Sequence, residues 1–214
     1  MDKKVVIWDI STRLFHWLLV VSILFSWISA ELGGNWMIWH TQSGYFIAGL
    51  LIFRIIWGFI GSGPSRFSSF IKGPKAVINY LAGKDKTQYL THNPAGAVSV
   101  LALISITLLM VITGLFGNDD IFIEGPLAYL ISYENQLIST ELHHILFKVL
   151  MLVIVTHLLA IAWYQRVKGE VLIKPMIDGY KDSEESAPRL VTGAPLYFAL
   201  ATAAAVVVWL FIVG

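Results

Sequence analysis

Five long apolar stretches dominate the chain, and polar connections separate them. They cover residues 14–30, 40–60, 94–117, 142–164 and 195–213. Each is long enough to cross about 30 Å of hydrocarbon as a helix, and far too long for a typical strand. The pattern predicts an all-α, polytopic transmembrane helix bundle. The first stretch could be read as a secretory signal, but it is aromatic, contains His16 and has Ile28 where a small residue is needed, so we expect it to remain as a span.

Composition supports a membrane protein and excludes several kinds of binding site. Of 214 residues, 57% are hydrophobic and 14% are charged, and the mean hydropathy is +0.71, whereas soluble domains have roughly 25% charged residues. The net charge of +1 gives no case for nucleic acid binding. The chain has no cysteine, which excludes disulfides, thiolate metal sites, iron–sulfur clusters and covalently attached c-type haem.

Lysine and arginine lie on alternate connections. The N-terminus, residues 61–93 and residues 166–189 are basic, whereas residues 31–39 and 118–140 contain neither lysine nor arginine. Because basic connections stay on the cytoplasmic side, we expect a multi-pass protein of the bacterial inner membrane. Its N-terminus would be cytoplasmic and its C-terminus periplasmic.

Histidines recur inside the spans at a helical spacing. His143 and His157 are 14 residues apart, which turns a helix to within about 40° of four full turns and raises it by about 21 Å. Both imidazoles therefore face the same way, one near each membrane surface. Ionisable side chains inside a membrane indicate function, because their burial requires a partner or a ligand.

Depth pairs these histidines with two others. His40 begins the second span on the outer side and pairs with His143, forming the outer pair; His16 begins the first span on the inner side and pairs with His157, forming the inner pair. We therefore predict two non-covalent, bis-histidine b-type haems, each bridging two helices. His144 competes with His143, but it points about 140° away from His157 on the helix, so His143 is the better ligand.

Two arginines are candidate partners of haem propionates. Arg54 lies 14 residues after His40, on the same face and at the inner level, and Arg13 lies three residues before His16. Arg54 could instead extend to the cytoplasmic surface six residues away. Small residues at 44, 49 and 114 would admit a flat macrocycle, although ordinary helix packing explains them equally well.

His92 and Asn93 precede the third span. Asn93 followed by Pro94 is typical of a helix start, with Asn as the N-cap. A functional reading is that His92 and Asn93 contact a quinone beside the inner haem, since a quinone needs hydrogen-bond donors and a route for protons.

Several motifs together resemble the prokaryotic cytochrome b561 family. They are Trp8-Asp9, Arg13-Leu-Phe-His16-Trp17, His40 with Gly44-Tyr45, Tyr89-Leu-Thr-His92-Asn93-Pro94, and His143 with His157. The resemblance covers roughly residues 5–182 and is greatest to the cytochrome b subunit of membrane-bound nickel–iron hydrogenases. It implies a four-helix bundle with two haems b that exchanges electrons between a periplasmic partner and the quinone pool, ubiquinone or menaquinone. His16, His40, His143 and His157 match the family's four haem ligands. His144 departs from the family pattern, which is often acidic there.

We accordingly divide the chain into a diheme cytochrome domain, residues 1–182, and a linker with a fifth transmembrane helix, residues 183–214. That helix contains no histidine or charge, and we expect it to pack against a partner, to pack against another copy in a homo-oligomer, or to serve as an anchor in the membrane lipid.

Three functions remain open on the sequence. The first is a quinone-linked electron-transfer subunit of an oxidoreductase in a respiratory chain, with a c-type cytochrome, hydrogenase or dehydrogenase as its periplasmic partner. The second is a self-sufficient superoxide:quinone oxidoreductase, and the third is a non-redox membrane protein. The outer loops have no lysine or arginine to attract an anion, which favours the first.

Overall fold

Five long helices lie in the described part of the chain, and each is apolar enough to span a membrane. The computed structural model describes residues 3–87, 89–121, 123–183 and 189–214. The long helices are α1 (Ile10–Leu32), α2 (Trp36–Ile60), α5 (Pro94–Phe116), α6 (Tyr133–Arg166) and α8 (Ala194–Val213). This confirms the predicted all-α, multi-pass bundle.

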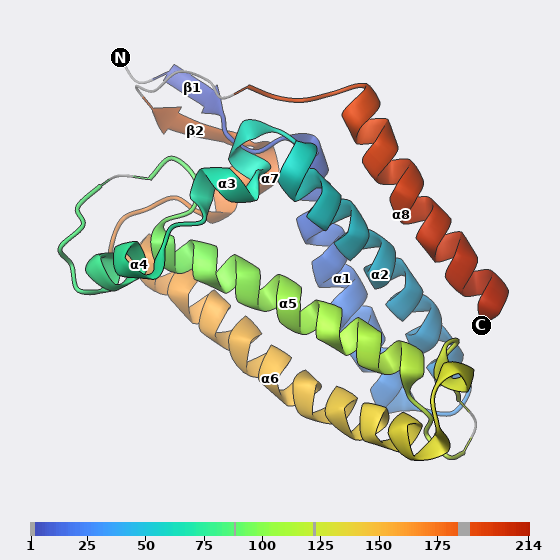
Figure 1. Cartoon of the computed structure of the whole chain (residues 1–214). Coiled ribbons are helices and arrows are strands. Elements are labelled where there is room, and N and C mark those ends of the chain that lie inside the picture. Colours follow the sequence, from blue (N-terminus) through green and yellow to red (C-terminus); the bar gives the residue numbers. More distant parts are fainter. Residues whose placement is uncertain (1–2, 88, 122, 184–188) are drawn as a thin grey trace.

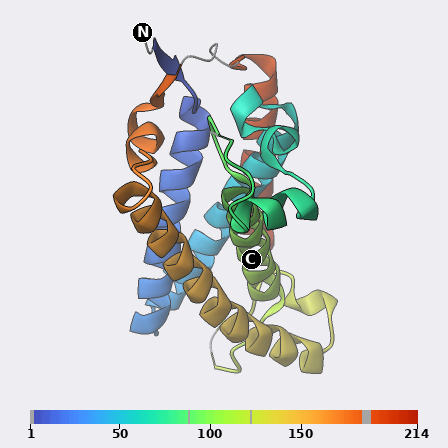
Figure 2. The same cartoon turned by 90° about the vertical axis from the view of Figure 1, so that its left-hand side faces the viewer.

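The helices pack as two antiparallel pairs. Helix α1 packs on α2, α5 packs on α6, and the pairs meet where α2 contacts α5 (Figures 1 and 2). Helices α1 and α6 make little direct contact with each other. Side chains of the two helices still meet, since the Trp27 and Phe147 ring centres are 5.9 Å apart.

The fifth helix packs inside its own chain. Helix α8 lies along α2 (Figure 1), where Ala199 and Ala203 are buried. A side chain at Gly49 would collide with Val207 of α8, so the small residue permits this close approach. One face of the predicted partner-facing helix is thus covered by α2, and homo-oligomer formation remains a prediction.

Helix ends follow local capping chemistry. Asp9 accepts a hydrogen bond from the Thr12 N–H at the start of α1, and Asn93 accepts one from the Gly96 N–H at the start of α5, which confirms the predicted Asn cap. Helices α2 and α6 begin earlier than the apolar stretches, so His40 and His143 lie inside their helices. Hydropathy marks only the hydrocarbon segment, whereas a helix continues through polar interfacial residues.

A cap of short elements covers one end of the bundle, here called the N-terminal end. Strand β1 (Lys3–Val6) pairs antiparallel with β2 (Tyr180–Ser183), so that Val5 lies opposite Lys181. The other short elements are η1 (Gly63–Ser65), α3 (Phe67–Phe70), α4 (Pro74–Leu81) and α7 (Ile173–Asp178). Val5, Ile7 and Trp8 form a small apolar core with Leu90 and Met176. The hydropathy pattern did not predict this cap.

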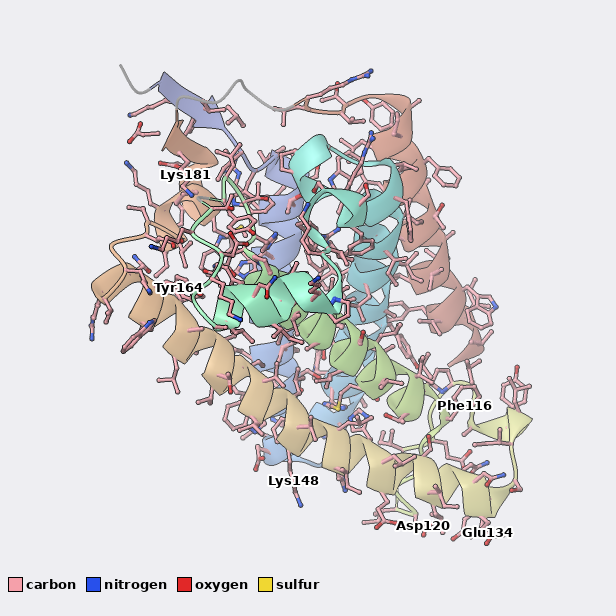
Figure 3. The ribbon with its side chains drawn as sticks, turned by 60° about the vertical axis from the view of Figure 1, so that its left-hand side comes forward. Phe116, Asp120, Glu134, Lys148, Tyr164 and Lys181 are labelled. Atoms are coloured by element: carbon pink, nitrogen blue, oxygen red, sulfur yellow. The ribbon has the colours of Figure 1, made fainter. Side chains whose placement is uncertain are left out.

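The opposite end, here called the far end, carries the connection from α5 to α6, which includes η2 (Ala128–Leu130). The Asn118 amide donates to Glu124 and Gln136, and the Gln136 amide donates to the Ala128 carbonyl. Figure 3 places Asp120 and Glu134 at this end, beyond Phe116.

Candidate functional site

The outer pair consists of His40 on α2 and His143 on α6, and the structure brings the two rings together. Their ring centres are 6.0 Å apart and their planes are inclined at 81°. A metal lies about 2.0 Å from an imidazole nitrogen, which lies about 1.1 Å from the ring centre, so two histidines that hold one metal would have ring centres up to about 6 Å apart. The observed spacing therefore fits two ligands of a single metal.

Backbone carbonyls hold both rings by Nδ1. His40 Nδ1 lies 2.9 Å from the Ser26 carbonyl oxygen of α1, and His143 Nδ1 lies 2.9 Å from the Met110 carbonyl oxygen of α5. A histidine that ligates a metal typically donates its other ring N–H in this way, which fixes its tautomer and orientation. Nε2 is consequently the nitrogen that each histidine offers to a ligand.

A cavity of about 600 Å³ lies at the outer pair. Its size is within the range of about 300–1,000 Å³ for cofactor sites. Gly44 lines it, and a Cβ built at Gly44 meets no atom within 4 Å, so the missing side chain leaves open space. Gly114 lies against the His143 ring, because a Cβ there would be 3.2 Å from His143 Cε1. The two positions thus have different uses: one leaves room for a ligand and the other admits a liganding ring.

His144 and Lys148 also line this cavity, on the more exposed side of α6. Figure 3 shows Lys148 pointing away from the bundle. Glu31 and Asp119 line the same cavity, so its charged groups are of both signs. The sequence analysis judged the attraction of an anion from the outer loops alone and therefore did not consider Lys148, which lies within a span.

The inner pair consists of His16 on α1 and His157 on α6. The two imidazoles are close enough to interact electrostatically. His157 Nδ1 lies 3.3 Å from Ser99 Oγ of α5, whereas His16 Nδ1 is buried and has no hydrogen-bond partner among the residues that the structure describes. The pair thus links α1 with α6 at the N-terminal end of the bundle.

Within the described residues, three buried side-chain nitrogens have no hydrogen-bond partner. They are Arg13 Nε, His16 Nδ1 and His92 Nδ1. All three belong to the N-terminal end, around the inner pair. Because buried polar atoms are normally satisfied, this grouping fits a bound group with acceptor oxygens, such as the propionates of a haem, or ordered water.

Arg54 is buried beside the inner pair. Only 3% of its surface is exposed; it donates to the Ser65 carbonyl at 3.1 Å, and its guanidinium lies 4.8 Å from the centre of the Phe67 ring. It also lies within electrostatic range of Asp9. Arg54 therefore does not extend into bulk water, and its predicted contact with a propionate remains a prediction.

Asp9 organises a polar network that sequence reasoning did not assign. Besides capping α1, its carboxylate accepts hydrogen bonds from Ser65 Oγ at 2.7 Å and from the Trp57 indole N–H at 3.3 Å. The Thr12 and Ser65 hydroxyls are 2.7 Å apart. An aspartate placed just before an apolar helix was the available signal, since that position favours an N-cap.

Arg13 and His92 contribute to the cap. Arg13 donates to the Ile177 carbonyl at the end of α7. The His92 ring lies between those of Trp8 and Phe70, at centre distances of 5.0 and 4.7 Å. Burial, followed by the nearby charges of Arg54 and His157, lowers the pKa of His92 to about 4. His92 is therefore neutral at pH 7.

The donor sets suit a macrocycle better than a bare metal ion. No group of three or more histidine, aspartate or glutamate side chains that could hold a metal ion occurs in the part of the chain that the structure describes. A haem supplies ring nitrogens of its own to the iron, so two imidazoles would suffice to hold it, and His40 with His143 or His16 with His157 would be those residues. A bundle of membrane-spanning helices with imidazoles facing each other across a cavity is the architecture of a membrane cytochrome.

The chain belongs to the prokaryotic cytochrome b561 family, whose model matches residues 7–179. It is accordingly a membrane haem b electron-transfer protein. Neither a curated protein nor a solved structure gives a match to this chain.

Proposed function

We propose that this protein holds two bis-histidine haems b and carries electrons across the bacterial inner membrane, between a periplasmic redox partner and the quinone pool. The outer pair carries the proposal: its ring centres are 6.0 Å apart and both Nδ1 atoms are held by carbonyls. His157 lies on the same helix as His143 and faces His16 at the other end. Haem iron supplies one-electron chemistry at each site.

The charge of the connections supports an orientation. The N-terminal end carries exposed lysines, including Lys72, Lys75, Lys84 and Lys86, and would be cytoplasmic. The far end carries Asp119, Asp120, Glu124 and Glu134 and would be periplasmic. A redox partner with a basic face, such as a c-type cytochrome, a hydrogenase or a dehydrogenase, would be attracted there.

Quinone would exchange at the N-terminal end, beside the inner pair. His92 lies within electrostatic range of His157, and its buried Nδ1 has no hydrogen-bond partner in the described part of the chain. Asn93 caps α5 at the same place. Either ubiquinone or menaquinone has carbonyl oxygens that would accept hydrogen bonds from such groups.

Lys148 favours one second candidate, a self-sufficient superoxide:quinone oxidoreductase. It lines the outer cavity, where a cation would attract a small anion, although its side chain points away from the bundle (Figure 3). Glu31 and Asp119 line the same cavity and oppose this attraction. Electron transfer with a docked protein therefore remains the first proposal.

Haem stoichiometry tests the proposal. We expect two haems per chain in a fully loaded preparation, with His143→Ala losing the outer haem and His157→Ala losing the inner one. His144→Ala is the matched control, because His144 adjoins His143 but is exposed, and it should retain both haems. A ratio of one in the parent protein, or two haems retained in either ligand variant, would refute the assignment of four ligands.

A further inference from the structure

Two tyrosines join the cap to the bundle at the end that holds the inner pair. The Tyr80 hydroxyl of α4 lies 2.9 Å from the Tyr164 hydroxyl of α6. Both side chains are half-buried, and Figure 3 shows Tyr164 beside α4. The two residues are 84 positions apart in the sequence, so only the folded chain creates this pair.

The pair has one hydroxyl hydrogen to spare. Each phenol carries one hydrogen and can donate once. Their mutual bond uses one of the two hydrogens, and the structure gives neither hydroxyl another hydrogen-bond acceptor among the described residues. One O–H group therefore remains available to an acceptor oxygen from outside the protein.

A third tyrosine nearby lacks this capacity. Tyr89 packs edge-on against Tyr80, with ring centres 5.9 Å apart, but its hydroxyl donates to Asp85 at 2.5 Å. The cluster thus contains one phenol whose hydrogen is already used and one pair with a hydrogen left.

Tyr164 shares a helix face with the inner ligand. It follows His157 by seven residues, which is within about 20° of two full turns and about 10.5 Å along the axis. Ile78 and Leu81 of the adjoining α4 are 65% and 70% exposed, so this corner is open to an apolar molecule arriving from lipid. Burial, together with the bond to Tyr164, raises the pKa of Tyr80, which keeps that hydroxyl protonated at neutral pH.

We propose that the Tyr80–Tyr164 pair binds the quinone: Tyr80 donates to Tyr164, and Tyr164 donates its own hydrogen to a quinone carbonyl oxygen. This rests on the proposed function, since it assigns residues to quinone exchange at the N-terminal end. Reduction of the quinone to a quinol adds two electrons, delivered singly from the inner site, and two protons drawn from water at that end; oxidation returns both. The tyrosines bind and orient the carbonyl and form no covalent bond.

Phenylalanine variants test the pair in the haem-loaded protein. The probe is decylubiquinone, with menadione run in parallel, and its dissociation constant is measured in detergent. We expect Tyr164→Phe to weaken binding at least tenfold and Tyr80→Phe two- to fivefold. Because both act on one hydrogen bond, the double variant should bind no more weakly than Tyr164→Phe alone, whereas independent structural effects would add. Haem spectra and midpoint potentials should match the parent.

Tyr89→Phe is the matched control, since it removes a phenol of the same cluster whose hydrogen is already used, and it should bind within twofold of the parent. The pair is not the donor if Tyr164→Phe binds the probe as tightly as the parent does, or if the losses of affinity in the two single variants add in the double variant. Either result leaves the proposed quinone exchange at this end intact. A parent protein that neither binds the probe nor exchanges electrons with its quinol would overturn the proposed function itself.

Discussion

The histidines of this chain differ in the hydrogen bonding of their Nδ1 atoms. His40 and His143 each place Nδ1 on a main-chain carbonyl, which commits Nε2 to a ligand. His92 has a buried Nδ1 to which none of the described residues hydrogen-bonds, and its ring is held between two aromatic rings. With its pKa lowered to about 4 by burial, His92 is a neutral imidazole at pH 7, able to hydrogen-bond a quinone but poorly suited to donate a proton.

We expect His92→Ala to slow electron exchange between the inner haem and a quinone analogue at least tenfold, which corresponds to about 1.4 kcal/mol of barrier. Both haems should remain bound with normal spectra, because His92 is not among the four ligands. Stopped-flow oxidation of the reduced protein measures the rate. Phe70→Leu, which loosens the packing around His92 but keeps its imidazole, should have a much smaller effect. If His92→Ala exchanged electrons with the quinone analogue at the rate of the parent protein, His92 would serve only in packing.

Small residues divide the long helices between packing and ligand binding. At Gly49 a side chain would strike Val207, so that position serves the contact between α2 and α8. At Gly44, one turn beyond His40, a side chain would enter the outer cavity. Two glycines on one helix therefore serve different purposes, ligand space at Gly44 and helix packing at Gly49. Only the position of the neighbouring helices distinguishes the two.

The cavity at Gly44 gives a prediction for α2. Gly44→Leu should abolish or strongly reduce loading of the outer haem, because the added side chain occupies the space that a macrocycle needs. The helix itself should not suffer, since leucine is favoured over glycine in a helix interior by about 0.5–1 kcal/mol. The inner haem is the internal control and should load normally. Reduced-minus-oxidised spectra and haem content measure both, and full occupancy of the outer site would show that the cavity is not the haem site.

At the scale of the molecule, the cap makes the two ends unlike. The N-terminal end is closed by the β1–β2 pair, α7 and the connection that contains α4, and Lys181 donates to the Tyr89 carbonyl within it. The far end carries, among the described residues, a short turn between α1 and α2 and the acidic connection between α5 and α6, which includes η2. The proposed roles follow this asymmetry, with quinone beneath the cap and a protein partner at the acidic end.

The absence of cysteine makes the orientation directly measurable. A single Asp120→Cys variant should react with a membrane-impermeant maleimide in intact spheroplasts, because the far end is expected to be periplasmic. Lys84→Cys, at an exposed position of the N-terminal end, should react only after the membrane is permeabilised. The parent protein is the unlabelled control. The reversed pattern would invert the proposed path of electrons.

The spans and the phase of the histidines were readable from the sequence. Crossing hydrocarbon requires about 20 consecutive apolar residues, and helical geometry fixes which side chains share a face; both depend only on neighbouring residues. The helix start at Asn93 depends on equally local capping chemistry, whereas the predicted first span began at Leu14 and missed the start at Asp9. The fold class and the family were therefore predicted and are confirmed. The rings of His40 and His143 lie together in the structure, and their role as ligands stays a prediction.

Tertiary structure decided what lies between distant segments. Strands β1 and β2 are short and polar, and they pair across about 175 residues, so no local period predicts them. The Ser26 and Met110 carbonyls that orient the outer ligands, the contact of α8 with α2, and the Tyr80–Tyr164 bond each join different helices. Main-chain carbonyls have no residue signature, and a phenol looks the same in a sequence whether its hydrogen is used or free. Local chemistry therefore fixed the helices, their caps and the histidine faces, while packing determined which polar atoms of distant segments found a partner.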